Sequence, residues 1–425
     1  MKKIAIIGAG ISGLSAAHFL KDRYEVTVYE KEDKPGGLIK CIRVNGNLFH
    51  TCGGHVFNSK RQDVLNWFWS IFDRDEDFIK ADRNSCVFMD KNNTSLEHED
   101  IPYPIENHMY LFSDEIQREF YKDLEEIDKV KGLNAKFSDY DSFGDFLRWR
   151  FGKTLYQLYF QPYNEKVWRR DLTTVPMSWL DGKLPMPTTQ DMRDNNANKI
   201  EEKTFVHSSF WYEKQNGSQY IADKLAEGIN IVYNANVDKL KYHNSKWFVS
   251  DQEFDNIVFC GNIKDITTMV EGVDISKYVQ QISNLEYHGT TAVFCEIDKN
   301  PYSWIYQPSN KHQSHRIICT GNFSNTNNSD LPNNRITATI EFTDAISKED
   351  IMKNLAFIPL NPKYLYHKYN QYTYPIQDAN TRSMIKNLKL ELSVTGLYFT
   401  GRFADWEYYN MDMAIGASMD LCNKI

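Results

Sequence analysis

The amino-acid sequence predicts an α/β fold in three parts: a Rossmann-type nucleotide-binding domain, an inserted helical domain and a mixed or antiparallel β-sheet domain. Three observations predict it. A glycine-rich turn follows the first apolar run, helical spacing of apolar residues dominates the stretch after Pro104, and strand patterns return after Phe205. At 425 residues the chain is long enough for two or three domains.

The glycine-rich turn is part of the opening stretch. Ile4–Ile7 is a short apolar run typical of a buried parallel strand, and a helix from Ser12 to about Lys21 follows it. Between them stands a G-x-G-x-x-G pattern formed by Gly8, Gly10 and Gly13. These glycines permit a tight turn, close approach of a pyrophosphate and close packing of helix on strand, and the helix aims its first amides at the phosphate.

A second strand, Val26–Tyr29, completes the pattern. Glu30 ends this strand, where an acid is placed to accept a hydrogen bond from a ribose hydroxyl. Strand, glycines, helix, second strand and acid occur in the required order, which predicts a dinucleotide site.

The helical part begins with a clear start signal. Ser113 is an expected N-cap for a helix over Asp114–Val130. Ser142 with Asp145 predicts a capping box for a second helix, and Lys153–Phe160 is expected to continue as helix.

The later strand patterns indicate an antiparallel substrate-binding sheet, and they are strongest at Gly289–Glu296, Arg316–Thr320 and Arg335–Phe342. The asparagine-rich stretch Asn322–Asn334 is expected to be a mobile surface loop. We assign residues 1–84, 214–272 and 386–425 to the nucleotide-binding domain, 104–200 to the helical domain, and 85–103, 201–213 and 273–385 to the sheet domain.

Composition and net charge indicate which binding partners and which cellular compartment to expect. A net charge of −8 argues against a general nucleic-acid or membrane binder. Seven cysteines are scattered without a C-x-x-C pair, so we expect free thiols in a reducing cytoplasm and no metal site. The first strand begins at once and no apolar run approaches membrane-spanning length, so a cytoplasmic location is expected.

A second glycine pattern indicates whether the dinucleotide is a flavin or a nicotinamide nucleotide. Gly36-Gly37-Leu38 follows soon after Glu30, and a further glycine pair, Gly53-Gly54, precedes His55. Both pairs can be ordinary turns, but their placement resembles FAD enzymes of the amine-oxidase and sugar-mutase type. That resemblance implies FAD as the cofactor, held by the glycines and Glu30 together with Gly37, Leu38, Gly53, Gly54, Val237, Arg402 and Asp412.

Six separated motifs are more specific. They are HTCGGHVF (50–57), IPYP (101–104), QPYNEKVW (161–168), SWIYQP (303–308), YTYP (372–375) and GRFADWEY (401–408). In order and spacing they resemble the UDP-galactopyranose mutase family, its eukaryotic-type branch in particular. The resemblance implies a flavin reduced by NADPH or NADH, whose N5 forms an adduct with the anomeric carbon while a nucleoside diphosphate leaves. The sugar then recloses, interconverting pyranose and furanose forms without net redox change.

The same resemblance assigns residue roles. His55, Arg316 and Arg402 are the implied catalytic residues, with His55 against the flavin and the arginines at the diphosphate. Tyr306, Tyr374 and Tyr408 are implied to donate to phosphate, Tyr103 to stack on the base, and Asn164 and Trp168 to meet the nucleotide. The competing interpretations are a packed loop histidine, solvated arginines and core aromatic residues.

Four positions depart from the family pattern. Lys183 replaces a mobile-loop arginine, Glu106 a base-contacting glutamine, Phe323 a tyrosine and His207 an asparagine. These changes surround one ligand and therefore favour an altered sugar or base.

Three functions are compatible with these patterns. The first is a flavin-dependent nucleotide-sugar mutase, which binds a nucleotide sugar and has UDP-galactopyranose as its default substrate. The second is an amine-oxidase-type oxidoreductase, which would want an apolar or aromatic amine pocket rather than Arg316, Arg402 and a tyrosine cluster. The third is a silent nucleotide-sugar sensor. A homo-oligomer is left open.

Overall fold

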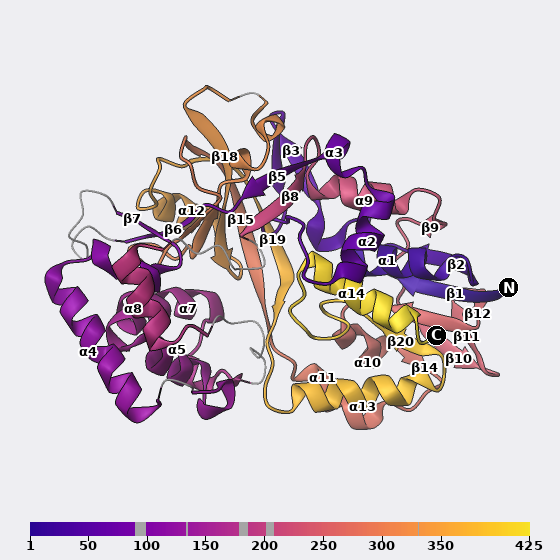
Figure 1. The fold of residues 1–425 in the computed structure, drawn as a ribbon. Helices are drawn as coiled ribbons and strands as arrows, with labels where there is room; N and C mark the ends of the chain where they lie inside the picture. The colour runs from indigo at the N-terminus through magenta and orange to yellow at the C-terminus, as the bar shows by residue number, and fades with distance from the viewer. Residues whose placement is uncertain (90–98, 133–134, 178–185, 201–207, 330) are drawn as a thin grey trace.

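The computed structural model describes residues 1–89, 99–132, 135–177, 186–200, 208–329 and 331–425. It consists of a helical lobe, a central sheet and a Rossmann-like lobe, and the two chain ends lie on the Rossmann-like side (Figure 1). The α/β fold class predicted from the sequence is confirmed. No helix in the described ranges combines the length and apolarity needed to cross a membrane.

The Rossmann-like lobe is built on a five-stranded parallel sheet. The strand order is β20 (Leu397–Phe399), β13 (Asn256–Phe259), β1 (Lys2–Ile7), β2 (Tyr24–Tyr29) and β9 (Ile231–Val232). Within β1, the aliphatic residues Ile4–Ile7 are buried because helices pack on the sheet, as expected for parallel strands. The surrounding helices are α1 (Ile11–Leu20), α2 (Gln62–Ile71), α3 (Arg74–Asp77), α9 (Ser218–Ala226), α10 (Ile266–Met269), α11 (Ser276–Ser283), α13 (Thr381–Ser393) and α14 (Met411–Cys422).

Smaller sheets flank this lobe. One contains β12 (Gln252–Phe254), β11 (Lys246–Val249), β10 (Leu240–His243) and β14 (Val270–Glu271). Two antiparallel pairs join β3 (Cys41–Val44) to β4 (Asn47–His50), which is a hairpin, and β5 (Phe78–Asp82) to β8 (Ser209–Glu213), which are distant in sequence.

The central sheet has seven strands. In order these are β19 (Lys363–Pro375), β15 (Tyr287–Asp298), β18 (Arg335–Thr343), β17 (Arg316–Ile318), β16 (Trp304–Tyr306), β6 (Ser85–Phe88) and β7 (Asp100–Pro102). All neighbouring strands are antiparallel except β16 and β6. Every residue of β18 is buried, and α12 (Lys348–Leu355) packs near the β19 side.

The helical lobe contains α4 (Asp114–Val130), α5 (Phe143–Phe151), α6 (Lys153–Leu155), α7 (Gln161–Trp168) and α8 (Thr189–Asn198). The prediction for α4 is confirmed, since the Ser113 hydroxyl accepts from the amide of Ile116. The capping box at Ser142 is wrong in one half: Ser142 accepts from the Asp145 amide, but the Asp145 carboxylate accepts from Asp141 instead.

The predicted helix over Lys153–Phe160 is also only partly right. After α6 the chain forms a π-helical turn at Tyr156–Phe160, and the Gln161 amide bonds back to the carbonyl of Tyr156. Pro162 follows and has no amide hydrogen, so it cannot donate the next α-helical bond.

The prediction of a surface loop over the asparagine-rich stretch is only partly right: Asn322, Asn325 and Asn334 are exposed, but the middle of the stretch packs into the protein. Asn325–Asn328 form a 3-10 turn in which Asn327 is fully buried, and its Nδ2 donates to the carbonyl of Thr320 at 2.8 Å. Asn328 likewise bonds the carbonyl of Gly321. The amide side chains replace missing backbone partners, which lets a polar stretch pack inside the protein.

Candidate functional site

A cavity lies at the carboxyl ends of β1 and β2, where the glycine-rich turn begins α1. Gly8 has φ +104°, a backbone conformation that favours glycine, and a Cβ on Gly13 would stand 1.9 Å from the Gly8 carbonyl oxygen. Gly10 supplies no side chain to cap α1, so the first amides of the helix face this cavity without a side-chain acceptor. Such an uncapped helix N-terminus, with a glycine turn before it, suits a pyrophosphate.

Glu30 is held at the end of β2. Its Oε2 accepts from the Ala9 amide at 2.8 Å and its Oε1 from the Glu32 amide at 3.0 Å. Each carboxylate oxygen can accept a second bond, so Glu30, which lines the cavity, remains able to bind a ribose hydroxyl. Gly37, Leu38 and Val237 line the same cavity, as the sequence predicts for a cofactor site.

His55 also reaches this cavity. Burial, together with the nearby positive charge of Arg402, lowers its pKa to about 4, so the imidazole is neutral at pH 7. Its Nε2 is buried and has no hydrogen-bond partner among the described residues. A buried polar atom without a partner at the wall of a cavity is evidence for a ligand at that place.

Three predicted cofactor residues lie elsewhere. The Gly53 amide donates to Glu341 at 2.9 Å, and a Cβ on Gly54 would stand 2.6 Å from Ile318 Cγ2, so this glycine pair packs against the central sheet. Asp412 begins α14, and its neighbours Met411 and Ala414 line the cavity while Asp412 does not.

The residues present therefore fit a dinucleotide. Uncapped amides and glycines would hold the pyrophosphate, Glu30 the ribose, and the region of His55 and Arg402 the far ring system. FAD has the length to run from the first region to the last.

The second region of the site connects the two implied catalytic arginines. The Arg402 guanidinium lies 4.6 Å from the ring centroid of Tyr408, and its Nη1 donates to the carbonyl of Thr373 at 3.2 Å. Tyr408 stacks on Tyr374 with ring centroids 5.5 Å apart and planes 4° from parallel. The Tyr374 hydroxyl accepts from Arg316 Nη2 at 3.1 Å. Two cations thus lie at the two ends of one stacked tyrosine pair.

Strand register explains the position of Arg316. Tyr306 on β16, Arg316 on β17 and Glu341 on β18 are direct cross-strand partners. Arg316 Nε donates to Glu341 Oε2. Burial alone would raise the pKa of Glu341, but Arg316 and then His315 outweigh it and hold this pKa well below its usual range. Glu341 is therefore a buried anion that orients Arg316.

A group of aromatic rings continues from Tyr306 towards the helical lobe. The Tyr306 ring centroid lies 5.0 Å from that of Tyr103 and 5.5 Å from that of Tyr163, and its hydroxyl accepts from Arg83. Burial is the first cause that raises the pKa of Tyr103, Tyr163 and Tyr374, so these hydroxyls stay protonated and able to donate.

The remaining predicted substrate residues are less directly placed. Asn164 on α7 donates from its Nδ2 to the Phe160 carbonyl in the preceding π-helical turn, and Trp168 packs against the core of the helical lobe. Glu106 is buried in the turn after Pro104. Phe323 lies in a ring cluster with Phe210 and Trp304 rather than beside Arg316. Lys183 and His207 lie outside the described residues.

Sequence reasoning missed three members of this site: Glu341, Tyr163 and Arg83. A single acid within the otherwise apolar and threonine-rich run of β18 was the available signal for Glu341. Tyr163 stands within a motif already singled out, next to Asn164. We find no sequence signal for Arg83.

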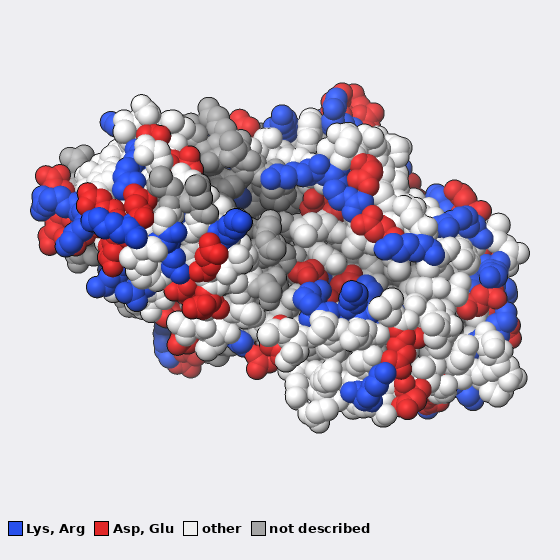
Figure 2. Space-filling view, turned by 60° about the horizontal axis from the view of Figure 1, so that its bottom comes forward, with Lys and Arg blue, Asp and Glu red and all other residues white. Residues whose placement is uncertain are grey.

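Acidic and basic side chains are interspersed on the face shown in Figure 2, without a broad positive surface there. Anion binding at the site would therefore depend on individual arginines.

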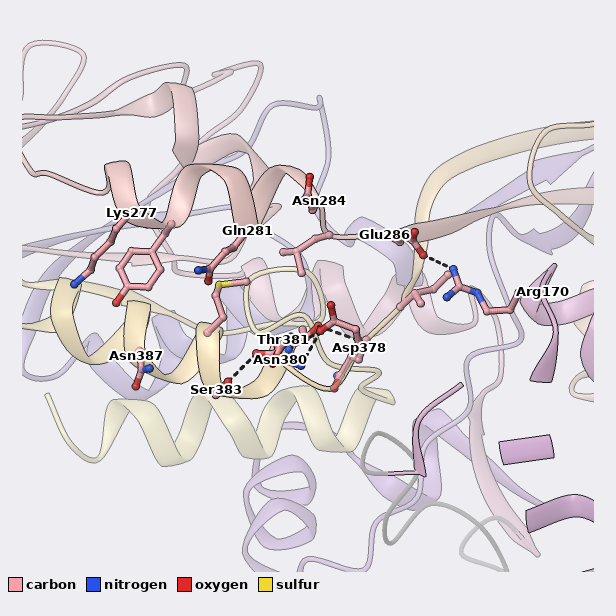
Figure 3. A pocket seen from close by; sticks show the side chains of 15 residues that line it. Arg170, Lys277, Gln281, Asn284, Glu286, Asp378, Asn380, Thr381, Ser383 and Asn387 are labelled. Carbon is pink, nitrogen blue, oxygen red and sulfur yellow. Dashed lines mark hydrogen bonds and ion pairs between the residues drawn. The ribbon is translucent and has the colours of Figure 1, made fainter. Parts of the chain in front are cut away.

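A second, larger cavity of about 820 Å³ is a groove between α11 and α13 (Figure 3). Its charged side chains already have partners: Arg170 contacts Glu286, Lys277 contacts Glu391, and Asp378 accepts from Thr381 at the start of α13. It contains neither the glycine turn nor the arginine–tyrosine stack.

Comparisons with known proteins agree with this architecture. Residues 6–74 match the family described as NAD(P)-binding Rossmann-like domain. The chain is 21% identical to UDP-galactopyranose mutase of Mycoplasma genitalium over 441 aligned positions, which cover 99% of this chain and 94% of the relative. A 1-hydroxycarotenoid 3,4-desaturase of a Flavobacterium species is 36% identical over 109 residues, only 25% of the chain.

Among solved structures, reduced UDP-galactopyranose mutase matches with a TM-score of 0.85 at 18% identity, covering 100% of this chain and 93% of that one. A putative protoporphyrinogen oxidase from Exiguobacterium sp. matches with a TM-score of 0.74 at 12% identity, covering 100% and 98%. The resemblance stated from the motifs is thus confirmed: this chain is similar to UDP-galactopyranose mutase from end to end and shares its fold.

Proposed function

We propose that this protein is a FAD-dependent nucleotide-sugar mutase that interconverts pyranose and furanose forms. UDP-galactopyranose and UDP-galactofuranose are the default substrates. The observation that carries the proposal is the arrangement of Arg402, Tyr408, Tyr374 and Arg316, which leads from the cofactor cavity to Glu341. An amine substrate is a cation, and two arginines beside it would repel it, so this arrangement suits an anionic ligand better.

The residues suit a leaving diphosphate. Arg316 can donate to phosphate oxygens. Its side chain is only 20% exposed, so little water screens its charge from an anion. Tyr374 and Tyr408 flank the path between the two cations and can donate hydroxyl hydrogens to an anion. When bound, a reduced flavin would supply the nucleophile for the anomeric carbon.

His55 contributes without charge. Because its pKa is lowered to about 4, it brings no positive charge to the flavin ring at pH 7, and its Nε2 is available for a hydrogen bond. We propose NADPH or NADH as the reductant. Anaerobic bleaching of the flavin absorbance by either nucleotide tests this choice.

The decisive experiment is anaerobic incubation of the dithionite-reduced protein with UDP-galactofuranose, followed by chromatography of the nucleotide sugars. We expect UDP-galactopyranose with reduced protein and none with oxidised protein. Arg316→Ala should retain FAD and lose conversion, whereas Arg148→Ala, an exposed arginine on α5, should convert as wild type.

Failure to convert this substrate, with FAD bound and reducible, would exclude UDP-galactofuranose. A panel of dTDP-, GDP- and UDP-N-acetyl sugars then tests the altered base or sugar suggested by Glu106, Lys183 and His207. Hydrogen peroxide formation with amines, and no sugar conversion, would support the oxidoreductase instead.

A further inference from the structure

A buried hydrogen-bond chain passes behind the cofactor cavity and crosses from the central sheet to the Rossmann-like lobe. Its members are Asn327, Tyr212, His50, Ser218 and Ile39. The first four are 1% exposed or less. Ile39 belongs to the 3-10 turn Gly37–Ile39 and lines the cavity.

Each link is short. Asn327 Nδ2 lies 3.1 Å from the Tyr212 hydroxyl, which lies 2.8 Å from His50 Nε2. His50 Nδ1 lies 3.2 Å from Ser218 Oγ, which donates to the carbonyl of Ile39 at 2.7 Å.

The two ends set the direction of the chain. The amide nitrogen of Asn327 can only donate, and the Ile39 carbonyl can only accept. His50 stands between these ends: its Nε2 faces the Tyr212 hydroxyl, and its Nδ1 lies beside both Ser218 Oγ and the His55 amide, which donates to it.

This environment keeps His50 uncharged. Burial, with a further contribution from His55, lowers the pKa of His50 to about 3. The Tyr212 hydroxyl is also closely packed, because a Cβ on Gly217 would stand 2.5 Å from its oxygen. No proton is gained or lost by the chain near neutral pH, so it can serve as a rigid connection.

We propose that His50 is a positioning residue for the cofactor site: through Ser218 it holds the Gly37–Ile39 turn, and through the backbone that follows β4 it places His55. The residue sits at the end of β4, five positions before His55, whose amide lies 3.4 Å from His50 Nδ1. Both sides of the FAD path are thereby tied to Asn327 in the 3-10 turn between β17 and β18. The inference rests on the proposed use of FAD and does not require mutase activity.

The test is FAD binding by the full chain, measured by titrating deflavinated protein, together with the visible flavin spectrum and midpoint potential. His50→Leu removes the ring's contacts with the Tyr212 hydroxyl, Ser218 and the His55 amide and should weaken FAD binding about tenfold. His50→Gln spaces an oxygen and a nitrogen similarly and should stay within about twofold of wild type. Tyr212→Phe should fall between them, and the double variant His50→Leu/Tyr212→Phe should bind no worse than His50→Leu.

His108→Leu is the matched control, because His108 is also buried and bonds a backbone carbonyl, but in the helical lobe. It should leave FAD affinity and the flavin spectrum unchanged.

Wild-type affinity and spectrum in His50→Leu, or equal losses in His50→Leu and His50→Gln, would overturn the inference, since only side-chain volume would then matter. If His50→Leu does not fold, the comparison of Tyr212→Phe with His50→Gln decides. A wild-type protein that binds no FAD overturns this inference and the proposed function together. One that binds FAD but converts no nucleotide sugar overturns the proposed function alone.

Discussion

Arg316 and Glu341 are direct cross-strand partners on β17 and β18, and the buried carboxylate of Glu341 is shared between the guanidinium of Arg316 and the amide of Gly53. One acid therefore joins the proposed phosphate-binding arginine to the glycine pair that precedes His55. Movement of either element would disturb the other.

Replacing Glu341 should lower the stability of the folded protein. Glu341→Gln leaves Arg316 buried without a counter-charge, and we expect the free energy of unfolding to fall by about 3 kcal/mol. Urea denaturation measures it. Glu349→Gln removes an exposed partner of Lys353 on α12 and should give no measurable change. A similar stability for both variants would contradict the role of Glu341.

Alanine substitutions at Gly13 and Gly10 of the glycine-rich turn should have different effects on stability and on FAD binding. A Cβ on Gly13 would collide with the Gly8 carbonyl at 1.9 Å, so Gly13→Ala should destabilise the apoprotein. A Cβ on Gly10 meets nothing closer than 3.9 Å, so Gly10→Ala should fold normally yet weaken FAD binding by about tenfold or more, because it fills the space for the pyrophosphate. Thermal unfolding of deflavinated protein and FAD titration separate the two effects. Normal FAD affinity in Gly10→Ala would place the cofactor elsewhere.

The Tyr374 hydroxyl should matter for the nucleotide rather than for the flavin. In Tyr374→Phe the ring can still stack on that of Tyr408. The variant loses the hydroxyl, which accepts from Arg316 Nη2 and is proposed to donate to the diphosphate. We expect the affinity for UDP, measured by calorimetry, to fall about fivefold, with FAD affinity unchanged. Tyr366→Phe, an exposed tyrosine on the same strand, is the control. An equal loss in both variants would mean that Arg316 does not meet the diphosphate.

Acid should destabilise the protein through its buried histidines. The pKa values of His50 and His55 are lowered, chiefly by burial, to about 3 and about 4, from the ordinary histidine value of 6.5. The unfolded chain therefore binds protons first as pH falls. The stability is fully present above pH 6.5 and is lost as pH falls towards these values, by up to about 1.4 kcal/mol per pH unit for each histidine.

The check is the free energy of unfolding by urea at a series of pH values from 7 to 4. His50→Gln should remove one histidine's share of the slope, and His243→Gln, an exposed position on β10, should leave the slope unchanged. A slope that is identical in His50→Gln and wild type would show that His50 is not kept neutral by the fold.

Local features were the most predictable from sequence. The helix over Asp114–Val130 could be placed to the residue because a serine cap and a helical apolar period mark it within its own sequence. The strand β19 could not be predicted, although its last four residues form one of the six motifs. Its exposed, tyrosine-rich sequence lacks the clean alternation of a half-buried strand.

Relations between strands could not be predicted in this way. Nothing near Arg316 indicates that residue 341 lies beside it, since the pairing depends on the register of β17 against β18. The burial of Asn327 is a similar case: asparagine-rich segments are usually exposed, and only the contact with Tyr212 and Thr320 supplies the partners that allow burial.

The sequence by itself determined the dinucleotide fingerprint from Gly8 to Glu30, the α/β fold class and the resemblance to the UDP-galactopyranose mutases, because each is encoded by residue type at fixed spacing along the chain. Only the tertiary structure decided that Arg316 pairs with Glu341, that Tyr374 stacks on Tyr408, and that His50 connects two lobes. Those relations join residues far apart in sequence, and they arise when buried polar groups must find partners during packing of the sheet.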